Sequence, residues 1–227
     1  MTATRVPADA SLCDAARDAL AAAALLLRAP DACIRAQLQA AGSTPVPSLA
    51  VLRQSFYDRF CIPQSGLYIP PYEHVFRRRE RIAGRWHFPP ARYGGADEVE
   101  AIYARFGFRP TQLDADPILR APHLPGDHLG FMLAFVGWTL QTADWNPATR
   151  RELAKPLAAF IAAHLDRWLE AYGWLLQESE PHGYAAAVGE AVVEARRTLE
   201  DLRRKINEPK QDQQQERRIQ AREPCIR

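Results

Sequence analysis

One stretch decides the fold: Leu124-Pro125-Gly126-Asp127-His128-Leu129-Gly130-Phe131-Met132-Leu133-Ala134-Phe135-Val136-Gly137-Trp138. From Leu129 onward it is apolar for more than two helical turns, which is typical of a helix buried on all sides. A proline, an acid and a histidine stand immediately before this helix. Polar groups at the mouth of a buried helix are costly unless they have a partner, so this entrance is the first candidate for a functional site.

The rest of the chain has the apolar spacing of α-helices. Apolar residues recur at three- and four-residue spacing, and we find no sustained alternation flanked by hairpin turn signals. This pattern predicts an all-α fold with a single globular domain over residues 1–206, followed by a polar, disordered tail over 207–227. The stretch 61–90 is rich in proline, and we expect it to contribute little to the core. The predicted helices cover about 11–27, 31–41, 48–60, 95–106, 129–141, 147–178 and 181–205.

Composition excludes several classes of partner. The chain has 227 residues with 29 basic and 27 acidic side chains, a net charge of +2 that gives no electrostatic case for nucleic acid. No apolar run approaches the roughly 20 residues that span a bilayer, so we expect no stable membrane insertion. The apolar run 19–27 lacks the basic region and cleavage site of a signal peptide, which favours a cytoplasmic protein. Four scattered cysteines form no C-x-x-C pair and are expected to be reduced.

Two polar residues begin the buried helix. Asp127 is placed to cap it by accepting hydrogen bonds from the backbone N–H groups of the first turn, which is worth about 1 kcal/mol and would by itself explain the residue. His128 would then lie in the first turn, where the helix dipole disfavours the imidazolium and keeps the ring neutral. A neutral ring both donates and accepts, which suits a peptide or a small polar ligand.

A second motif precedes it in the chain. Pro70 and Pro71 hold an extended approach, and Tyr72, Glu73 and His74 follow as the helical period resumes. The segment is explained either as a rigid turn beneath a core aromatic residue or as part of a site. The next residues, 77–81, read Arg-Arg-Arg-Glu-Arg, and we interpret them as the solvated end of a helix.

An enzymatic alternative is a metal-dependent helical hydrolase that uses Asp127, His128 and His164, with His123 and Glu73 as further ligands. No pair among them has the i, i+4 spacing of a helical zinc motif, and His164 lies on an apolar stripe typical of a core histidine. Phosphate-binding glycine motifs and nucleophile elbows are also absent from the sequence. We therefore expect no catalytic residue, metal site or cofactor.

Four segments, taken in order, are the basis of a resemblance to a known family. They are Phe56-Tyr57-Asp58-Arg59-Phe60, Ile69-Pro70-Pro71-Tyr72-Glu73-His74-Val75-Phe76, Pro125-Gly126-Asp127-His128-Leu129 and Phe160-Ile161-Ala162-Ala163-His164-Leu165-Asp166-Arg167-Trp168. In the same order they resemble a Tyr-x-x-Leu-Phe type segment, a proline-proline-aromatic motif, a Pro-x-Asp-His-Leu/Ile motif and a Phe-x-x-x-His-Leu-x-x-Trp helix of the TorD/DmsD/NarJ redox-enzyme maturation chaperones. Arg59 stands where that family usually has leucine.

The resemblance implies an all-α chaperone that recognises the twin-arginine leader and the apo-form of a molybdopterin-dependent oxidoreductase and delays export until the cofactor is inserted. Recognition of a folded partner subunit is the alternative within the family. Exchange of elements through the long connection 108–124 would allow a homodimer. The residues that fall on the family's leader-binding surface are Tyr57, Phe60, Pro70, Pro71, Tyr72, Pro125, Asp127 and His128, and Glu73 would join Asp127 in supplying acids for the leader's guanidinium groups.

Overall fold

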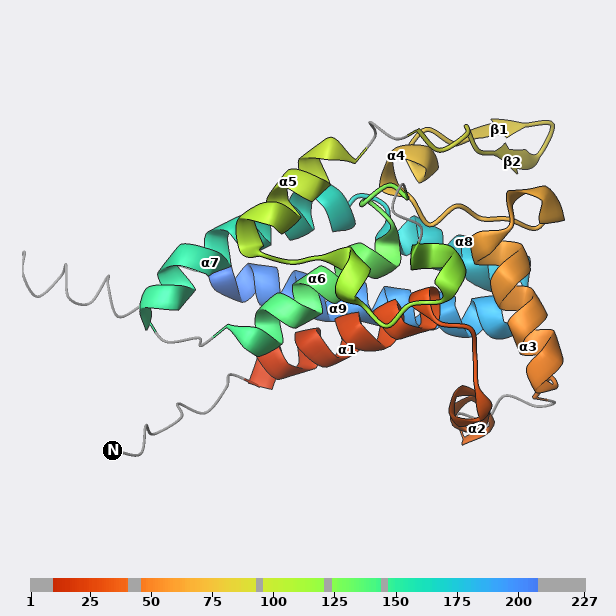
Figure 1. The fold of residues 1–227 in the computed structure, drawn as a ribbon, viewed down its shortest axis with the longest axis horizontal. Helices are drawn as coiled ribbons and strands as arrows, with labels where there is room; N and C mark the ends of the chain where they lie inside the picture. Colours follow the sequence, from red (N-terminus) through yellow and green to blue (C-terminus); the bar gives the residue numbers. More distant parts are fainter. Residues whose placement is uncertain (1–9, 41–45, 93–95, 121–123, 144–146, 208–227) are drawn as a thin grey trace, which may run out of the picture.

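The computed structural model describes residues 10–40, 46–92, 96–120, 124–143 and 147–207 and confirms the all-α class. Figure 1 shows the helices stacked around one core, with a small hairpin at the edge. The elements are α1 (Ala10–Leu27), α2 (Ala32–Ala40), α3 (Leu49–Phe56), α4 (Glu73–Phe76), β1 (Glu80–Ile82), β2 (Arg85–His87), α5 (Asp97–Phe106), α6 (Leu129–Thr142), α7 (Pro147–Phe160), α8 (Leu169–Ser179) and α9 (Tyr184–Asn207).

Helix α1 is the centre of the packing and lies against both α6 and α9 (Figure 1). Its buried face is made mainly of alanine, including Ala15, Ala19 and Ala22, none of which is exposed to solvent. Small side chains let α6 approach closely: a Cβ on Gly137 would lie 2.5 Å from Leu20 Cγ. The alanine-rich run near the N-terminus is therefore a packing surface.

The pair α8 and α9 uses glycine in the same way. A Cβ on Gly189 would lie 2.5 Å from the backbone oxygen of Gly173, so the two helix backbones touch at this point. Backbone cannot move aside as a flexible side chain can, and a larger residue would separate the helices. This contact fixes α8 against α9, and Tyr184 at the start of α9 ties that helix to α1 through a hydrogen bond from its hydroxyl to Leu25 O (2.7 Å).

Several predicted helix limits need correction. The predicted long helix 147–178 is interrupted by a π-helical turn, Ile161–Leu165, before α8 begins at Leu169. The helix expected from residue 95 begins at Asp97, and the last helix begins at Tyr184 rather than residue 181. The predicted left-handed cap at Gly107 is confirmed by its φ of 71°.

The expectation that 61–90 contributes little to the core is wrong. Ile69, Tyr72, Val75 and Phe76 are all buried, and Phe76 packs its ring against Trp168 and Tyr172. Helical periodicity missed them because α4 has only four residues. The same stretch contains the antiparallel hairpin of β1 and β2, which we did not predict: all six strand residues are exposed, so their sequence carries no alternation.

Some predictions lie outside the described residues. They concern the tail beyond Asn207, His123, Cys225 and the turn at 144–146. The domain boundary at 206 consequently stays a prediction. Within the described ranges, no helix is long and apolar enough to cross a bilayer.

Candidate functional site

The two polar motifs meet in the fold, although more than fifty residues separate them. Tyr72 and His128 form an isolated antiparallel bridge. The backbone N–H of Leu129 donates to Pro71 O (2.6 Å), and that of Glu73 donates to Asp127 O (3.1 Å). We call the residues 70–74 and 125–129 the junction, because this pair of hydrogen bonds joins the start of α4 to the start of α6.

The side chain of Asp127 hydrogen-bonds to α4 and not, as predicted, to the first turn of α6. Its Oδ2 accepts the backbone N–H of His74 (2.7 Å) and lies 2.6 Å from His74 Nδ1. His74 Nε2 accepts a hydrogen bond from the backbone N–H of Arg92 (3.0 Å), so the ring proton is on Nδ1 and the ring is neutral. The carboxylate is almost completely buried and holds α4 in place from a distant point in the chain.

The cap of α6 is His128 itself. Its Nδ1 accepts the backbone N–H of Gly130 (3.0 Å), which leaves the ring proton on Nε2. The side chain has no exposed surface, and this burial lowers the pKa of His128 from 6.5 to about 3. The ring is therefore neutral as predicted, but because of burial. Nε2 has no hydrogen-bond partner among the described residues, and the Tyr72 ring packs edge-on at 5.2 Å between centroids.

Glu73 connects the junction to the helix pair α7 and α8. Its Oε1 accepts from Arg77 (2.7 Å), and its Oε2 lies 2.9 Å from Nδ1 of His164. His164 stands in the π-helical turn Ile161–Leu165, an irregularity that is frequent at functional sites. These residues line a cavity of about 400 Å³, together with His74, Arg78, Glu98 and Val99.

Helix α5 contacts the junction at Gly126. Glu100 accepts the backbone N–H of Gly126 (3.0 Å), and the hydroxyl of Tyr103 donates to Gly126 O (3.0 Å). A Cβ on Gly126 would lie 2.6 Å from Glu100 Cγ, so the close contact favours glycine here. Beside this contact lies a second cavity of about 450 Å³, whose apolar lining includes Phe108, Leu119, Leu124 and Phe131.

Tyr57 and Phe60 have a different set of neighbours. They stand in the π-helical turn Tyr57–Cys61, where the half-buried Tyr57 donates its hydroxyl to Asp116 Oδ2 (2.8 Å) and Phe60 packs against Tyr184. Arg59, the departure from the family pattern, is buried and lies 3.3 Å from a carboxylate oxygen of Glu180. This segment therefore anchors the start of α9.

The structure thus brings Pro70, Pro71, Tyr72, Glu73, Pro125, Asp127 and His128 together as a buried junction, with Tyr57 and Phe60 on a separate segment. Sequence reasoning missed three residues of α5, namely Glu98, Glu100 and Tyr103. Acids in the first turn of a helix are common because they complement its dipole, so nothing in the sequence marked them as part of a site.

Within the part of the chain that the structure describes, which leaves out His123, the side chains named for the hydrolase alternative do not form a metal site. Among the described residues, no group of three acidic, histidine or cysteine side chains is placed to hold a metal ion. Asp127 Oδ2 accepts from the backbone and ring of His74, His128 Nδ1 accepts the backbone N–H of Gly130, and His164 Nδ1 lies within hydrogen-bond distance of Glu73.

Comparison with known families gives an independent result. The sequence pattern described as the nitrate reductase delta subunit matches residues 10–172, a range that contains the junction, both cavities and both π-helical turns. The chain belongs to the nitrate reductase delta subunit family. This family consists of NarJ/TorD-type chaperones for molybdoenzyme maturation and is not catalytic. No curated protein and no solved structure matches the chain significantly.

Proposed function

We propose that this member of the nitrate reductase delta subunit family is a cytoplasmic, system-specific chaperone that binds the twin-arginine leader of a molybdopterin oxidoreductase subunit in its apo-form. It would assist cofactor insertion and delay export. One observation carries the proposal: α5 lines two cavities that both contain junction residues. One contains the carboxylates of Glu73 and Glu98, and the other has four apolar side chains in a wall that also includes charged residues.

The first cavity suits guanidinium groups. Glu73 and Glu98 line it together with Arg77 and Arg78, and among the described residues the ion pair in this set joins Arg77 to Glu73 and leaves Glu98 without one. Carboxylates bind guanidinium through charge-assisted, often bidentate hydrogen bonds. Glu73 already pairs with Arg77, whose side chain is 40% exposed. A leader arginine would therefore exchange with Arg77 at Glu73, while a second arginine would meet the unpaired Glu98.

The second cavity suits the apolar segment that follows the two arginines in such a leader. Phe108, Leu119, Leu124 and Phe131 supply aliphatic and aromatic surface, and Tyr103 and Gly126 connect the cavity wall to the junction. An amphipathic helix commonly binds by placing its apolar face in a groove of this kind. The predicted site residues would then support the binding surface from beneath, because most of them are buried.

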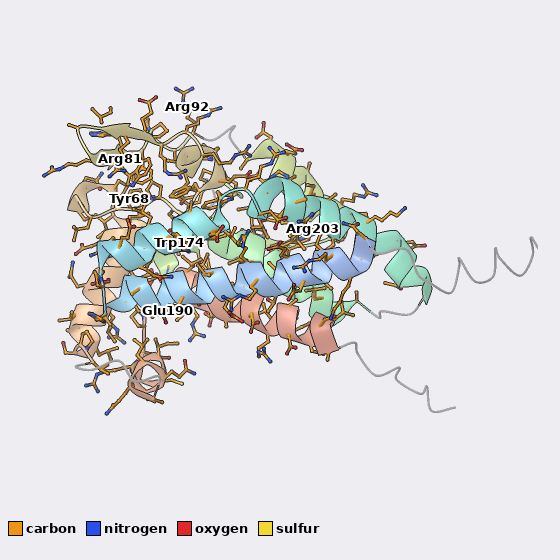
Figure 2. The ribbon with its side chains drawn as sticks, turned by 180° about the vertical axis from the view of Figure 1, so that it is seen from behind. Tyr68, Arg81, Arg92, Trp174, Glu190 and Arg203 are labelled. Carbon is orange, nitrogen blue, oxygen red and sulfur yellow. The ribbon has the colours of Figure 1, made fainter. Side chains whose placement is uncertain are left out.

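Calorimetric titration of the full chain with a synthetic twin-arginine leader peptide tests the proposal. We expect Glu98→Gln to weaken binding by about tenfold, since a charged hydrogen bond contributes on the order of 1.5–3 kcal/mol. Glu190→Gln is the matched control, because Glu190 is exposed on α9 (Figure 2) and lines neither cavity. Equal affinity of both variants and the parent chain would remove the acidic cavity from the site.

Recognition of the apo-subunit beyond its leader is a separable part of the proposal. The chaperone is mixed with the client subunit with and without its leader. Loss of the complex upon leader removal supports leader recognition. A complex that survives indicates that the chaperone holds the subunit body instead. In that case Glu98→Gln should leave the affinity unchanged.

A further inference from the structure

The hairpin of β1 and β2 is the feature that the proposed chaperone function leaves unexplained. It extends from the helical body at the end of α4 (Figure 1), and every residue from 80 to 87 is exposed. Figure 2 shows Arg81 and Arg92 at the outer edge of this region. A two-stranded hairpin whose residues are all exposed contributes little to stability, so its side chains are available for another purpose.

The charge of this segment is opposite to that of the rest of the chain. Residues 77–92 contain six arginines, Arg77, Arg78, Arg79, Arg81, Arg85 and Arg92, against the single acid Glu80. Removing these from the 29 basic and 27 acidic residues of the chain leaves 23 and 26, a net negative remainder. Among the described residues, only Arg77 of the six pairs with a carboxylate. The net charge of the whole chain is close to zero, but residues 77–92 form a cationic surface.

Apolar side chains lie among these charges. Ile82 is 51% exposed and Trp86 is 38% exposed. Arg81 and Trp86 face each other across the hairpin, and the guanidinium carbons of Arg79 and Arg81 lie 5.0 Å and 5.6 Å from the centroid of the Trp86 ring. These cation–π contacts hold the tryptophan beside the arginines.

The turn between the strands is also apolar. Ala83 has a φ of 48° and Gly84 a φ of 81°, so both central residues are left-handed, as in a two-residue hairpin turn that normally prefers asparagine before glycine. Alanine is disfavoured in this conformation. The sequence places a methyl group at the tip in preference to the polar residue that the backbone favours.

We propose that this hairpin docks the chaperone reversibly onto the surface of an anionic phospholipid bilayer. Arginines bind lipid phosphates, and tryptophan and isoleucine enter the interfacial region beneath the headgroups, where amphipathic aromatic side chains are favoured. Clustered basic residues of this kind are attracted to anionic leaflets. The helical body remains outside the bilayer.

The apolar residues favour a lipid surface over a nucleic acid or an acidic peptide. Base stacking needs an open aromatic face, and two guanidinium groups already contact the Trp86 ring. Ile82 and Ala83 at the tip offer nothing to a phosphate backbone or a carboxylate, but they gain free energy on leaving water at a lipid interface.

Vesicle sedimentation tests the inference with the full chain. We expect binding to vesicles of equal parts phosphatidylglycerol and phosphatidylcholine, and no binding to pure phosphatidylcholine. Arg81→Gln with Arg85→Gln should lower the partition coefficient about 25-fold, because each basic residue near an anionic leaflet contributes about fivefold. Ile82→Ser with Trp86→Ser should reduce the binding that persists at high salt, where the charge attraction is screened.

A charge-matched control removes two arginines elsewhere. Arg197→Gln with Arg204→Gln changes the net charge equally on the exposed surface of α9, and we expect less than a twofold change. A similar loss in this control would show that total charge, not the hairpin, binds the vesicle. Absence of binding by the parent chain overturns the inference, as does tighter binding to single-stranded RNA or to polyglutamate than to anionic vesicles. Leader titration of the hairpin variants should be unchanged, which separates this inference from the proposed function.

Discussion

The contact of α1 with α6 and the junction beside it are both largely buried, but the first is apolar and the second is polar. Alanine, leucine and glycine make the first, and its close approach needs only small side chains. The junction contains two carboxylates, Glu73 and Asp127, and two histidines, His74 and His128, and each of the four has a hydrogen-bond partner. Apolar side chains can pack in several arrangements with similar energies, whereas a buried carboxylate is stable only where its hydrogen-bond donors are in place.

The difference indicates a division of labour. The apolar contact gains free energy by removing apolar surface from water, and the junction fixes the position of α4, α5 and α6 relative to one another. Its hydrogen bonds link residues 53, 26 and 91 positions apart in the chain, so they form only when these helices and the π-helical turn Ile161–Leu165 are in place. The cavities of the proposed site depend on that alignment.

The largest effect should come from the apolar side. Phe135 is fully buried and packs its ring against Tyr103 and Phe160 at 5.1 Å and 4.9 Å between centroids. Phe135→Ala should lower the free energy of unfolding by about 3–5 kcal/mol in chemical denaturation, because it leaves a cavity. Trp174→Ala is the control: Trp174 is 57% exposed, and its loss should change stability by less than about 0.5 kcal/mol. Similar losses in both variants would mean that Phe135 is not a core residue.

Substitutions of Asp127 test how much the polar junction contributes to stability. Asp127→Ala deprives the backbone and ring N–H groups of His74 of their acceptor, and we expect it to destabilise the fold by roughly 3 kcal/mol. Asp127→Asn keeps an acceptor oxygen in the same place without the charge, so its cost should be about half. Hydrogen exchange at α4 should accelerate more than at α1 in both variants. Uniform acceleration throughout the chain would contradict a local role for the junction.

The junction also predicts a dependence on pH. His128 has a pKa of about 3 in the fold, against 6.5 for an exposed ring, so the unfolded chain binds more protons between these two values. Stability should fall as the pH falls through this window, by on the order of 2 kcal/mol between pH 6.5 and 5. His128→Asn retains a capping side chain without a titrating group, and its slope should be smaller over the same range. An unchanged slope would assign the acid sensitivity to other groups.

The smallest effect should be at the edge of the junction. Glu73→Gln weakens the pairs with Arg77 and His164 but leaves a polar group of the same size, so we expect a loss of about 1 kcal/mol. Glu194→Gln breaks an exposed pair with Arg197 on α9 and should cost less than about 0.5 kcal/mol in thermal unfolding. Equal losses of stability in the two variants would mean that the pairs of Glu73 contribute no more than an exposed ion pair.

Much of this fold could be predicted from the sequence, and the errors share a cause. The helical class followed from the apolar period, and the cap at Gly107 from its residue type. Sequence reasoning erred at α4 and the hairpin because neither is long enough to show a period. It assigned all the proposed site residues to one surface, whereas the structure places Tyr57 and Phe60 on a separate segment. It also assigned the Asp127 side chain to the wrong helix, because a carboxylate beside a helix start is typical of a cap of that helix.

The sequence by itself determined that this chain forms helices, that α6 is buried on all sides, and that Asp127 and His128 stand at its entrance. Those features depend on spacing and residue type over a few turns. Only the tertiary structure decided that Asp127 binds His74, that His128 is itself the cap of α6, that Glu73 contacts His164, and that α5 lines two cavities. Hydrogen bonds between distant residues form only after packing aligns the helices, so local periodicity cannot encode their partners.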